Sequence, residues 1–182
     1  MVGGMEYPVD TDFRVWIGFQ SILTSQEGDE EKSARIYAMM EQFGLPVSEA
    51  SLEAMVQFFE GASSEHRSGE GNKNPAFDFE LDSAYIFSAF MGAYEIDLTT
   101  ARLHWWKFKA LFQALPDDCE LCKIMRYRTI DLKDVPKGQK QFYRQMKTRY
   151  ALQGAAGTAH RTENELKDYV KRRFEDARNM QK

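Results

Sequence analysis

The chain has 182 residues, 43% of them hydrophobic and 13% aromatic, which is enough apolar material for the core of one ordinary domain. No run approaches the roughly 18 apolar residues that cross a bilayer, and the first residues lack the positive and apolar regions of a signal peptide. We therefore expect a protein that is neither secreted nor inserted in a membrane and that stays in the cytoplasm.

The net charge of −4 hides a strong asymmetry between the two halves of the chain. Residues 1–100 contain 18 acidic against 5 basic side chains (−13), whereas residues 101–182 contain 10 against 19 (+9). Opposite charges can draw two halves of one molecule together, or two molecules head to tail. A homo-oligomer is therefore one expectation, and the basic half raises a nucleic-acid-binding hypothesis.

The first third of the chain predicts three helices. One runs from about residue 10 or 11 to 24, the second spans 30–43, and the third begins at residue 48 or 51. Gly44 and Gly61 follow the second and third helices, where a helix commonly ends. Each helix has apolar residues on one side only, so each must dock on a neighbouring element.

Residues 61–75 contain three glycines and no large apolar side chain, and they predict a flexible loop. Further helices follow at about 78–94, 100–114, 117–127 and 136–152. The sequence therefore predicts an all-α fold, with a helical domain over 1–152 that is divided by the loop into sub-lobes 10–60 and 77–152.

The helix at 100–114 carries apolar residues on nearly all sides, which is typical of a buried central helix. His104-Trp105-Trp106 within it resembles an aromatic ligand site, but a place in the core is the favoured interpretation. We assign five large side chains to the structural core: Trp16, Phe90, Trp106, Phe108 and Leu111.

Residues 153–161 are mostly small and uncharged, so they predict a flexible linker to a C-terminal amphipathic helix over 162–182. That helix carries a narrow apolar stripe, which we predict to bind a partner: Leu166, Tyr169, Val170, Phe174 and Ala177. The stripe would suit a groove of the same chain, a neighbouring copy or a partner helix. A simple packed terminal helix is the alternative.

Cys119 and Cys122 have the spacing of a redox pair or of half a zinc site. A structural zinc needs four ligands, and the chain offers only His66, His104 and His160 in addition, none of them paired in sequence. We therefore expect two reduced cysteines of a helix.

Asp78, Glu80 and Asp82 resemble the start of a calcium-binding loop, but Ser83 and Ala89 stand where that loop needs Gly and Glu. Carboxylates at a helix N-terminus explain the cluster better. No phosphate-binding loop, metalloprotease motif or nucleophile elbow is present. We expect no catalytic residue, no metal and no cofactor, and a protein that is not an enzyme.

Two basic clusters bear on the nucleic-acid hypothesis: Lys171-Arg172-Arg173, and Arg126 and Arg128 on either side of Tyr127. They could contact phosphates or stack on bases. A solvated helix face is the alternative, and the acidic isoelectric point of about 5.5 favours it. We expect nucleic acid not to be a partner.

Several segments of the chain resemble one family of phage proteins over about residues 7–152. The segments are Tyr7-Pro8-Val9-Asp10-Thr11-Asp12-Phe13, Phe77-Asp78-Phe79-Glu80, Tyr94-Glu95-Ile96-Asp97-Leu98, Leu103-His104-Trp105-Trp106-Lys107-Phe108, Ile130-Asp131-Leu132 and Tyr150-Ala151-Leu152. The chain thereby resembles the bacteriophage gene-product-fifteen family of long-tailed phages and prophages of Gram-positive bacteria. Members begin somewhat earlier, so the start of this chain looks shortened.

The resemblance implies a function that the residues alone do not. Members of the family look like neighbours of the tape-measure gene, a position typical of tail assembly chaperones. It implies that this chain binds the tape-measure protein and tail-tube subunits without catalysis. The alternatives are a virion structural protein of the tail or neck, and a nucleic-acid-binding protein that uses the basic C-terminal half.

Overall fold

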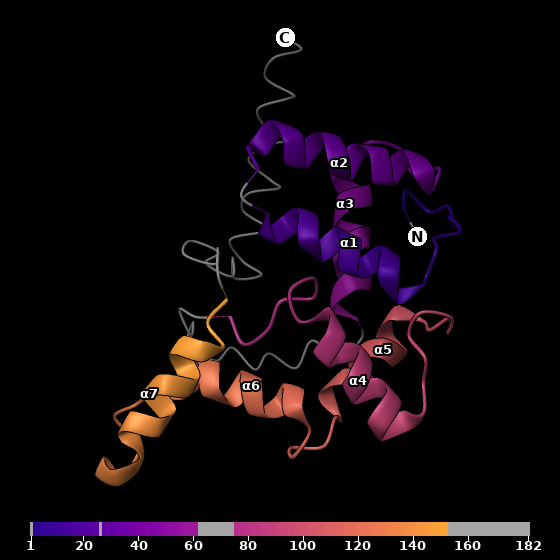
Figure 1. Ribbon diagram of the computed structural model, residues 1–182. Helices are drawn as coiled ribbons and strands as arrows, with labels where there is room; N and C mark the ends of the chain where they lie inside the picture. The colour runs from indigo at the N-terminus through magenta and orange to yellow at the C-terminus, as the bar shows by residue number, and fades with distance from the viewer. Residues whose placement is uncertain (1, 26, 62–74, 153–182) are drawn as a thin grey trace. The chain divides into compact units, whose positions relative to one another are not determined.

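The computed structural model describes residues 2–25, 27–61 and 75–152, and these residues form α-helices without any β-strand (Figure 1). The all-α prediction is therefore confirmed. The linker predicted at 153–161, the C-terminal helix predicted at 162–182 and nearly all of the loop predicted at 61–75 lie outside the described residues. The elements are α1 (Phe13–Thr24), α2 (Asp29–Gln42), α3 (Glu49–Glu60), α4 (Ser83–Tyr94), α5 (Trp105–Gln113), α6 (Glu120–Thr129), the 3₁₀ helix η1 (Lys137–Gln139) and α7 (Lys140–Arg149).

The described residues belong to two compact units. The first unit contains residues 2–61 together with Leu103–Trp106, and the second contains 75–102 together with 107–152. Helix α5 therefore begins with two residues that belong to the first unit, and its remaining residues belong to the second. Each unit is described by itself below.

Side-chain caps and glycines set the helix ends of the first unit. Asp12 caps α1 by accepting the backbone N–H of Arg14, and Ser48 caps α3 by accepting the N–H of Ser51. The cap of α1 thus falls one or two residues later than the predicted cap at residue 10 or 11. Gly44 and Gly61, with φ of +65° and +79°, follow α2 and α3 in conformations that favour glycine.

The core of the first unit is aromatic. Trp16 on α1 is fully buried, and its ring lies 6.1 Å from that of Phe43 and 4.4 Å from that of Phe58. Phe19 is also fully buried and meets Phe59 edge to face. These contacts join α1, the end of α2 and the end of α3 around one hydrophobic centre.

Residues 103–105 pair with the entry to α1 instead of forming helix. The N–H of Phe13 donates to the carbonyl of Leu103, and the N–H of Trp105 donates to that of Thr11, at 2.9 and 2.7 Å. Asp12 and His104 thereby form an isolated antiparallel bridge. The prediction of a helix from residue 100 is therefore wrong at its start, because this long-range pairing uses the backbone groups that a helix would need.

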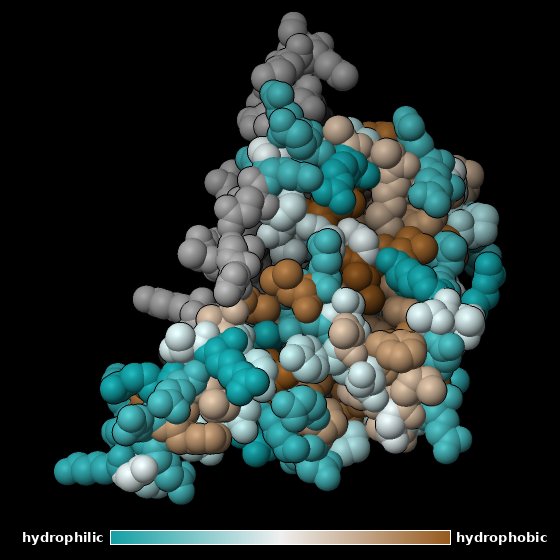
Figure 2. All heavy atoms as spheres, in the orientation of Figure 1, coloured by the Kyte–Doolittle hydropathy of each residue, from teal (hydrophilic) through white to brown (hydrophobic). Residues whose placement is uncertain are grey.

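The second unit packs α4 against α6 and buries its own aromatic cluster. Phe90 on α4 and Phe108 on α5 are buried, with ring centroids 5.1 Å apart and planes inclined by 9°. Tyr94 donates its hydroxyl to the carbonyl of Leu111 at 2.8 Å. Helix α7 packs on α6 and has no buried residue, and hydrophilic side chains cover much of it in Figure 2.

Two members of the predicted core do not lie in it. Trp106 is 42% exposed and Leu111 is half-buried, whereas Trp16, Phe90 and Phe108 are buried. The neighbour of Trp106, Trp105, is buried in its place. Apolar character on all sides of a nine-residue helix therefore does not bury every residue equally.

Candidate partner-binding groove

An apolar groove opens in the first unit beside Trp106. It encloses about 440 Å³ and is lined by side chains from the N-terminal segment, the α2–α3 connection, the C-terminal half of α3 and the start of α5. Its apolar lining includes Val2, Tyr7, Val9, Leu45, Phe58 and Trp106. The volume falls in the range of about 300–1,000 Å³ that is common for ligand pockets, and Trp106 reaches solvent, so the groove is accessible.

Two indole N–H groups hold the groove's tryptophan region in place. Helix α3 ends at Glu60, and its last carbonyls have no partner further along the helix. The Nε1–H of Trp106 donates to the carbonyl of Phe58 at 2.6 Å, and that of Trp105 donates to the carbonyl of Phe59 at 2.7 Å. The two tryptophans therefore cap the end of α3.

Ring contacts fix the plane of Trp106. Its ring stacks on Phe58 with centroids 5.0 Å apart, and His104 approaches its edge at 5.1 Å. Nδ1 of His104 also accepts the backbone N–H of Trp106 at 3.2 Å. Gly61 lies against the same ring, because a Cβ there would come within 3.4 Å of it. The indole is thus held rigidly while one side stays open.

The unit that contains the groove carries a net negative charge. Residues 2–61 contain 11 acidic and 3 basic side chains, a balance of −8. Glu6, Asp10 and Glu53 are exposed, and each is adjacent in sequence to a residue that lines the groove. An apolar segment with basic flanks is therefore the complementary ligand.

The partner-binding residues predicted from the sequence lie elsewhere in the chain. Leu166, Tyr169, Val170, Phe174 and Ala177 are outside the described residues, and their role stays a prediction. The groove itself was not predicted, because it joins residues that are as far apart in sequence as Val2 and Trp106.

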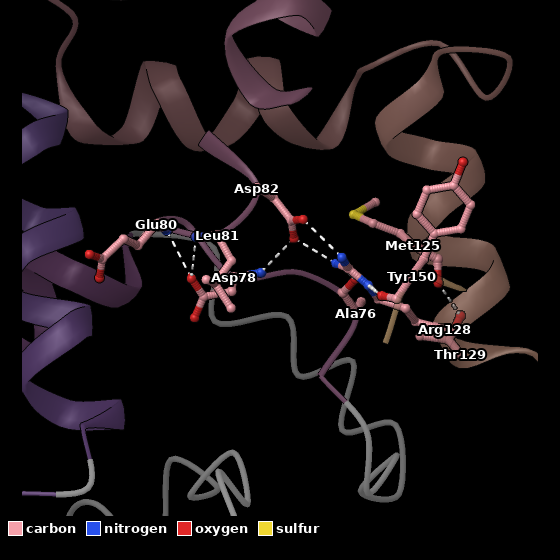
Figure 3. Close-up of polar contacts among 9 residues, drawn as sticks. All are labelled: Ala76, Asp78, Glu80, Leu81, Asp82, Met125, Arg128, Thr129 and Tyr150. Atoms are coloured by element: carbon pink, nitrogen blue, oxygen red, sulfur yellow. Dashed lines mark hydrogen bonds and ion pairs between the residues drawn. The ribbon is translucent and has the colours of Figure 1, made fainter. Parts of the chain in front are cut away.

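The acidic cluster that resembles a calcium loop has a structural role in the second unit (Figure 3). The carboxylate of Asp82 receives both terminal nitrogens of Arg128 and the backbone N–H of Asp78. Asp78 accepts the N–H groups of Glu80 and Leu81 and so closes the turn before α4. Among the described residues, no three His, Cys, Asp or Glu side chains are grouped so as to hold a metal ion.

The two cysteines stand at the start of α6. Cys119 caps the helix, with its sulfur accepting the N–H of Cys122 at 3.4 Å, and both thiols are free. Burial, helped by the hydrogen bond with Cys119, raises the pKa of Cys122 to about 11. A raised pKa suppresses the thiolate and makes Cys122 a poor nucleophile at neutral pH.

The basic residues around Tyr127 are only partly available to a nucleic acid. Arg128 is buried and paired with Asp82, so it cannot contact a phosphate, whereas Arg126 is exposed. The ring of Tyr127 stacks on Tyr150 and meets Phe142 edge to face. These contacts hold α7 on α6 and favour a structural role for the aromatic side chains.

No helix in the described ranges is long and apolar enough to span a membrane. No curated protein and no solved structure matches the chain significantly. The family model described as Bacteriophage Gp15 protein matches residues 1–152, which is 152 of the 182 residues. The chain therefore belongs to the Bacteriophage Gp15 protein family.

Proposed function

We propose that this protein is a tail assembly chaperone that binds the tape-measure protein and tail-tube subunits, without catalysis, in the cytoplasm of the host bacterium. The apolar groove beside Trp106 is the observation that supports a binding role. Membership of the Bacteriophage Gp15 protein family supports the choice of partner. The resemblance implies that members of this family are encoded by genes beside the tape-measure gene.

The groove has the properties of a protein-binding site. Large aromatic side chains such as Trp and Tyr supply much of the binding energy at interfaces when they line a pocket. Trp106 is held by its hydrogen bond to Phe58 and by the stacked ring, so little side-chain entropy remains to be lost on binding. An amphipathic helix that lays its apolar side into such a groove is the ligand we propose.

Co-expression with the tape-measure protein of the same phage tests the proposal. The wild-type chain should capture the tape-measure protein, and Trp106→Ala should weaken capture at least tenfold. Val9→Glu, a second change in the groove lining, should act in the same direction without removing a core side chain. Phe142→Ala, which removes a similarly exposed aromatic residue from α7, is the matched control and should bind normally. Equal capture by all four proteins would refute the role of the groove.

Mass spectrometry of purified virions separates the chaperone from a structural protein of the tail or neck. A chaperone acts during assembly and should be absent from the finished particle, whereas a tail or neck protein should be present in fixed copy number. Recovery of this chain from washed virions at the level of known tail proteins would replace the proposed function with the structural one.

A further inference from the structure

We propose that the groove beside Trp106 is occupied by the C-terminal part of the same chain until a partner displaces it. The residues that would enter it are Leu166, Tyr169, Val170 and Phe174, which lie outside the described residues. The inference rests on the groove being a binding site, as in the proposed function, and it names how that site is regulated.

The groove exposes a large apolar side chain that the rest of the described unit leaves uncovered. Of the three tryptophans, Trp16 and Trp105 are 0% and 2% exposed, and Trp106 is 42% exposed. The groove next to it is mostly apolar and large enough for several side chains. A covering segment removes this surface from water and contributes the hydrophobic free energy of its burial.

The C-terminal sequence supplies a segment of matching pattern. Leu166, Tyr169, Val170 and Phe174 are spaced i, i+3, i+4 and i+8, which places them on one side of a helix. The stripe is too narrow for a helix buried in a core but fits the contact of a helix with a groove. Its aromatic and branched side chains suit the ring faces of Trp106 and Phe58.

Charge favours the same pairing. Residues 161–182 contain 7 basic and 5 acidic side chains, a balance of +2, and residues 2–61 carry −8. Lys171, Arg172 and Arg173 stand between two stripe residues, Val170 and Phe174, so the stripe would bring basic side chains to an acidic unit. The attraction raises the rate and the selectivity of docking.

The stripe is joined to the described residues by a connection of considerable length. Thirteen residues separate Leu152 from Leu166, and a chain of that length can extend over about 45 Å. Because the stripe belongs to the same chain, the contact is intramolecular, which raises the effective concentration of the stripe at the groove. A partner with a stronger apolar helix can still displace it.

Acrylamide quenching of tryptophan fluorescence tests the occupancy in the full chain without any partner. Acrylamide can reach Trp106 only when the groove is open and hardly reaches the two buried tryptophans in either state, so the quenching constant reports on the groove. The double variant Val170→Asp, Phe174→Asp should at least double the constant and shift the emission to longer wavelength. Asn164→Asp, Asn179→Asp is the matched control, because it adds two negative charges on the side of the helical pattern opposite the stripe.

Two further measurements keep the result unambiguous. In a Trp106→Phe background the difference between the stripe variant and the control should disappear, which assigns it to Trp106. Light scattering should give the same mass for wild type and stripe variant. Equal quenching in wild type and stripe variant would overturn the proposal, and a mass that falls on stripe mutation would show that a neighbouring copy supplies the segment.

The failure of this inference and the failure of the proposed function give different results. Quenching is measured with no tape-measure protein present, so a difference that depends on the stripe supports occupancy even when no variant captures that protein. If the tape-measure protein does bind the groove, the stripe variant should capture it at least as well as wild type. Weaker capture by the stripe variant would mean that the stripe itself binds the tape-measure protein. That result would overturn the proposal that the stripe and the partner compete for the groove.

Discussion

Arg128 and Asp82 form a two-pronged ion pair inside the second unit. Nη1 of Arg128 lies 2.5 Å from Oδ2 of Asp82 and Nη2 lies 2.8 Å from Oδ1, with the side chains 8% and 2% exposed. The same guanidinium donates to the carbonyls of Ala76 and Tyr150, at 3.1 and 2.6 Å. One arginine on α6 thereby joins the segment before α4 to the residue that ends α7 (Figure 3).

We predict that Arg128→Ala destabilises the protein by about 3–5 kcal/mol, because it leaves the buried carboxylate of Asp82 without its partner. Urea unfolding followed by circular dichroism measures the loss. Arg126→Ala, on the same helix but exposed, is the control and should change stability by less than about 0.5 kcal/mol. A loss below about 1 kcal/mol for Arg128→Ala would contradict this account of the pair.

Lysine should not replace Arg128. The guanidinium makes two parallel bonds to the carboxylate and two more to carbonyls, whereas an ammonium group has one nitrogen at one position. We expect Arg128→Lys to recover less than half of the stability that Arg128→Ala loses, measured in the same urea series. Recovery to the wild-type midpoint would show that charge alone matters at this position.

Local signals in the sequence predicted where helices end more accurately than they predicted how the helices pack. Ser48, Gly44 and Gly61 act through their own backbone or nearest neighbours, so their positions could be read directly from the sequence. The start of α5 was missed because it depends on hydrogen bonds between residues about 90 positions apart, Phe13 with Leu103 and Thr11 with Trp105. No periodicity within one helix contains that information.

The same limit explains the candidate site. Sequence periodicity predicted an apolar helix over residues 100–114 and assigned Trp106 to the core, because it could not distinguish which tryptophan faces inward. The fold decides this through two carbonyls at the end of α3. The carbonyl of Phe59 accepts the indole N–H of the buried Trp105, and the carbonyl of Phe58 accepts that of the exposed Trp106. The groove exists because Trp106 is the exposed one, and only the fold determines this.

Trp105→Ala and Trp106→Ala should differ strongly although the residues are neighbours. Trp105 is buried and stacks on Phe59, so its removal leaves a cavity and should cost about 3–5 kcal/mol. Trp106 is 42% exposed, and its removal should cost about 1–2 kcal/mol, from one hydrogen bond and a partly buried ring. Thermal and urea unfolding compare these losses in the Val170→Asp, Phe174→Asp background, in which the proposed covering segment is removed from Trp106. Equal losses in that background would contradict the difference in burial between the two rings.

Two glycines should respond oppositely to alanine. Gly92 lies within α4, is exposed, and a Cβ there would meet nothing within 4 Å, so Gly92→Ala should stabilise the protein by about 0.5–1 kcal/mol. Gly61 has φ +79° and ψ 174°, a region that only glycine adopts readily, so Gly61→Ala should cost about 1–3 kcal/mol. Melting curves of wild type, Gly92→Ala and Gly61→Ala measure both stability changes. A stabilising Gly61→Ala would contradict the conformation at the end of α3.

Cys122 should be alkylated slowly in the folded protein. Burial raises the pKa of its thiol from 9.0 to about 11, and the thiolate is the reactive form. At pH 8 roughly a thousandth of the thiol is then ionised, against about a tenth in the unfolded chain, so iodoacetamide should react about a hundredfold more slowly in buffer than in urea.

Because the folded protein holds this proton more tightly, the stability contributed by Cys122 is complete below pH 9. It should fall as the pH rises from 9 to 11, where the unfolded chain loses the proton first. Peptide mass spectrometry follows the alkylation, and urea midpoints of wild type and Cys122→Ser across this range isolate the linkage. Equal alkylation rates in buffer and urea at pH 8 would show that the thiol is not protected by the start of α6.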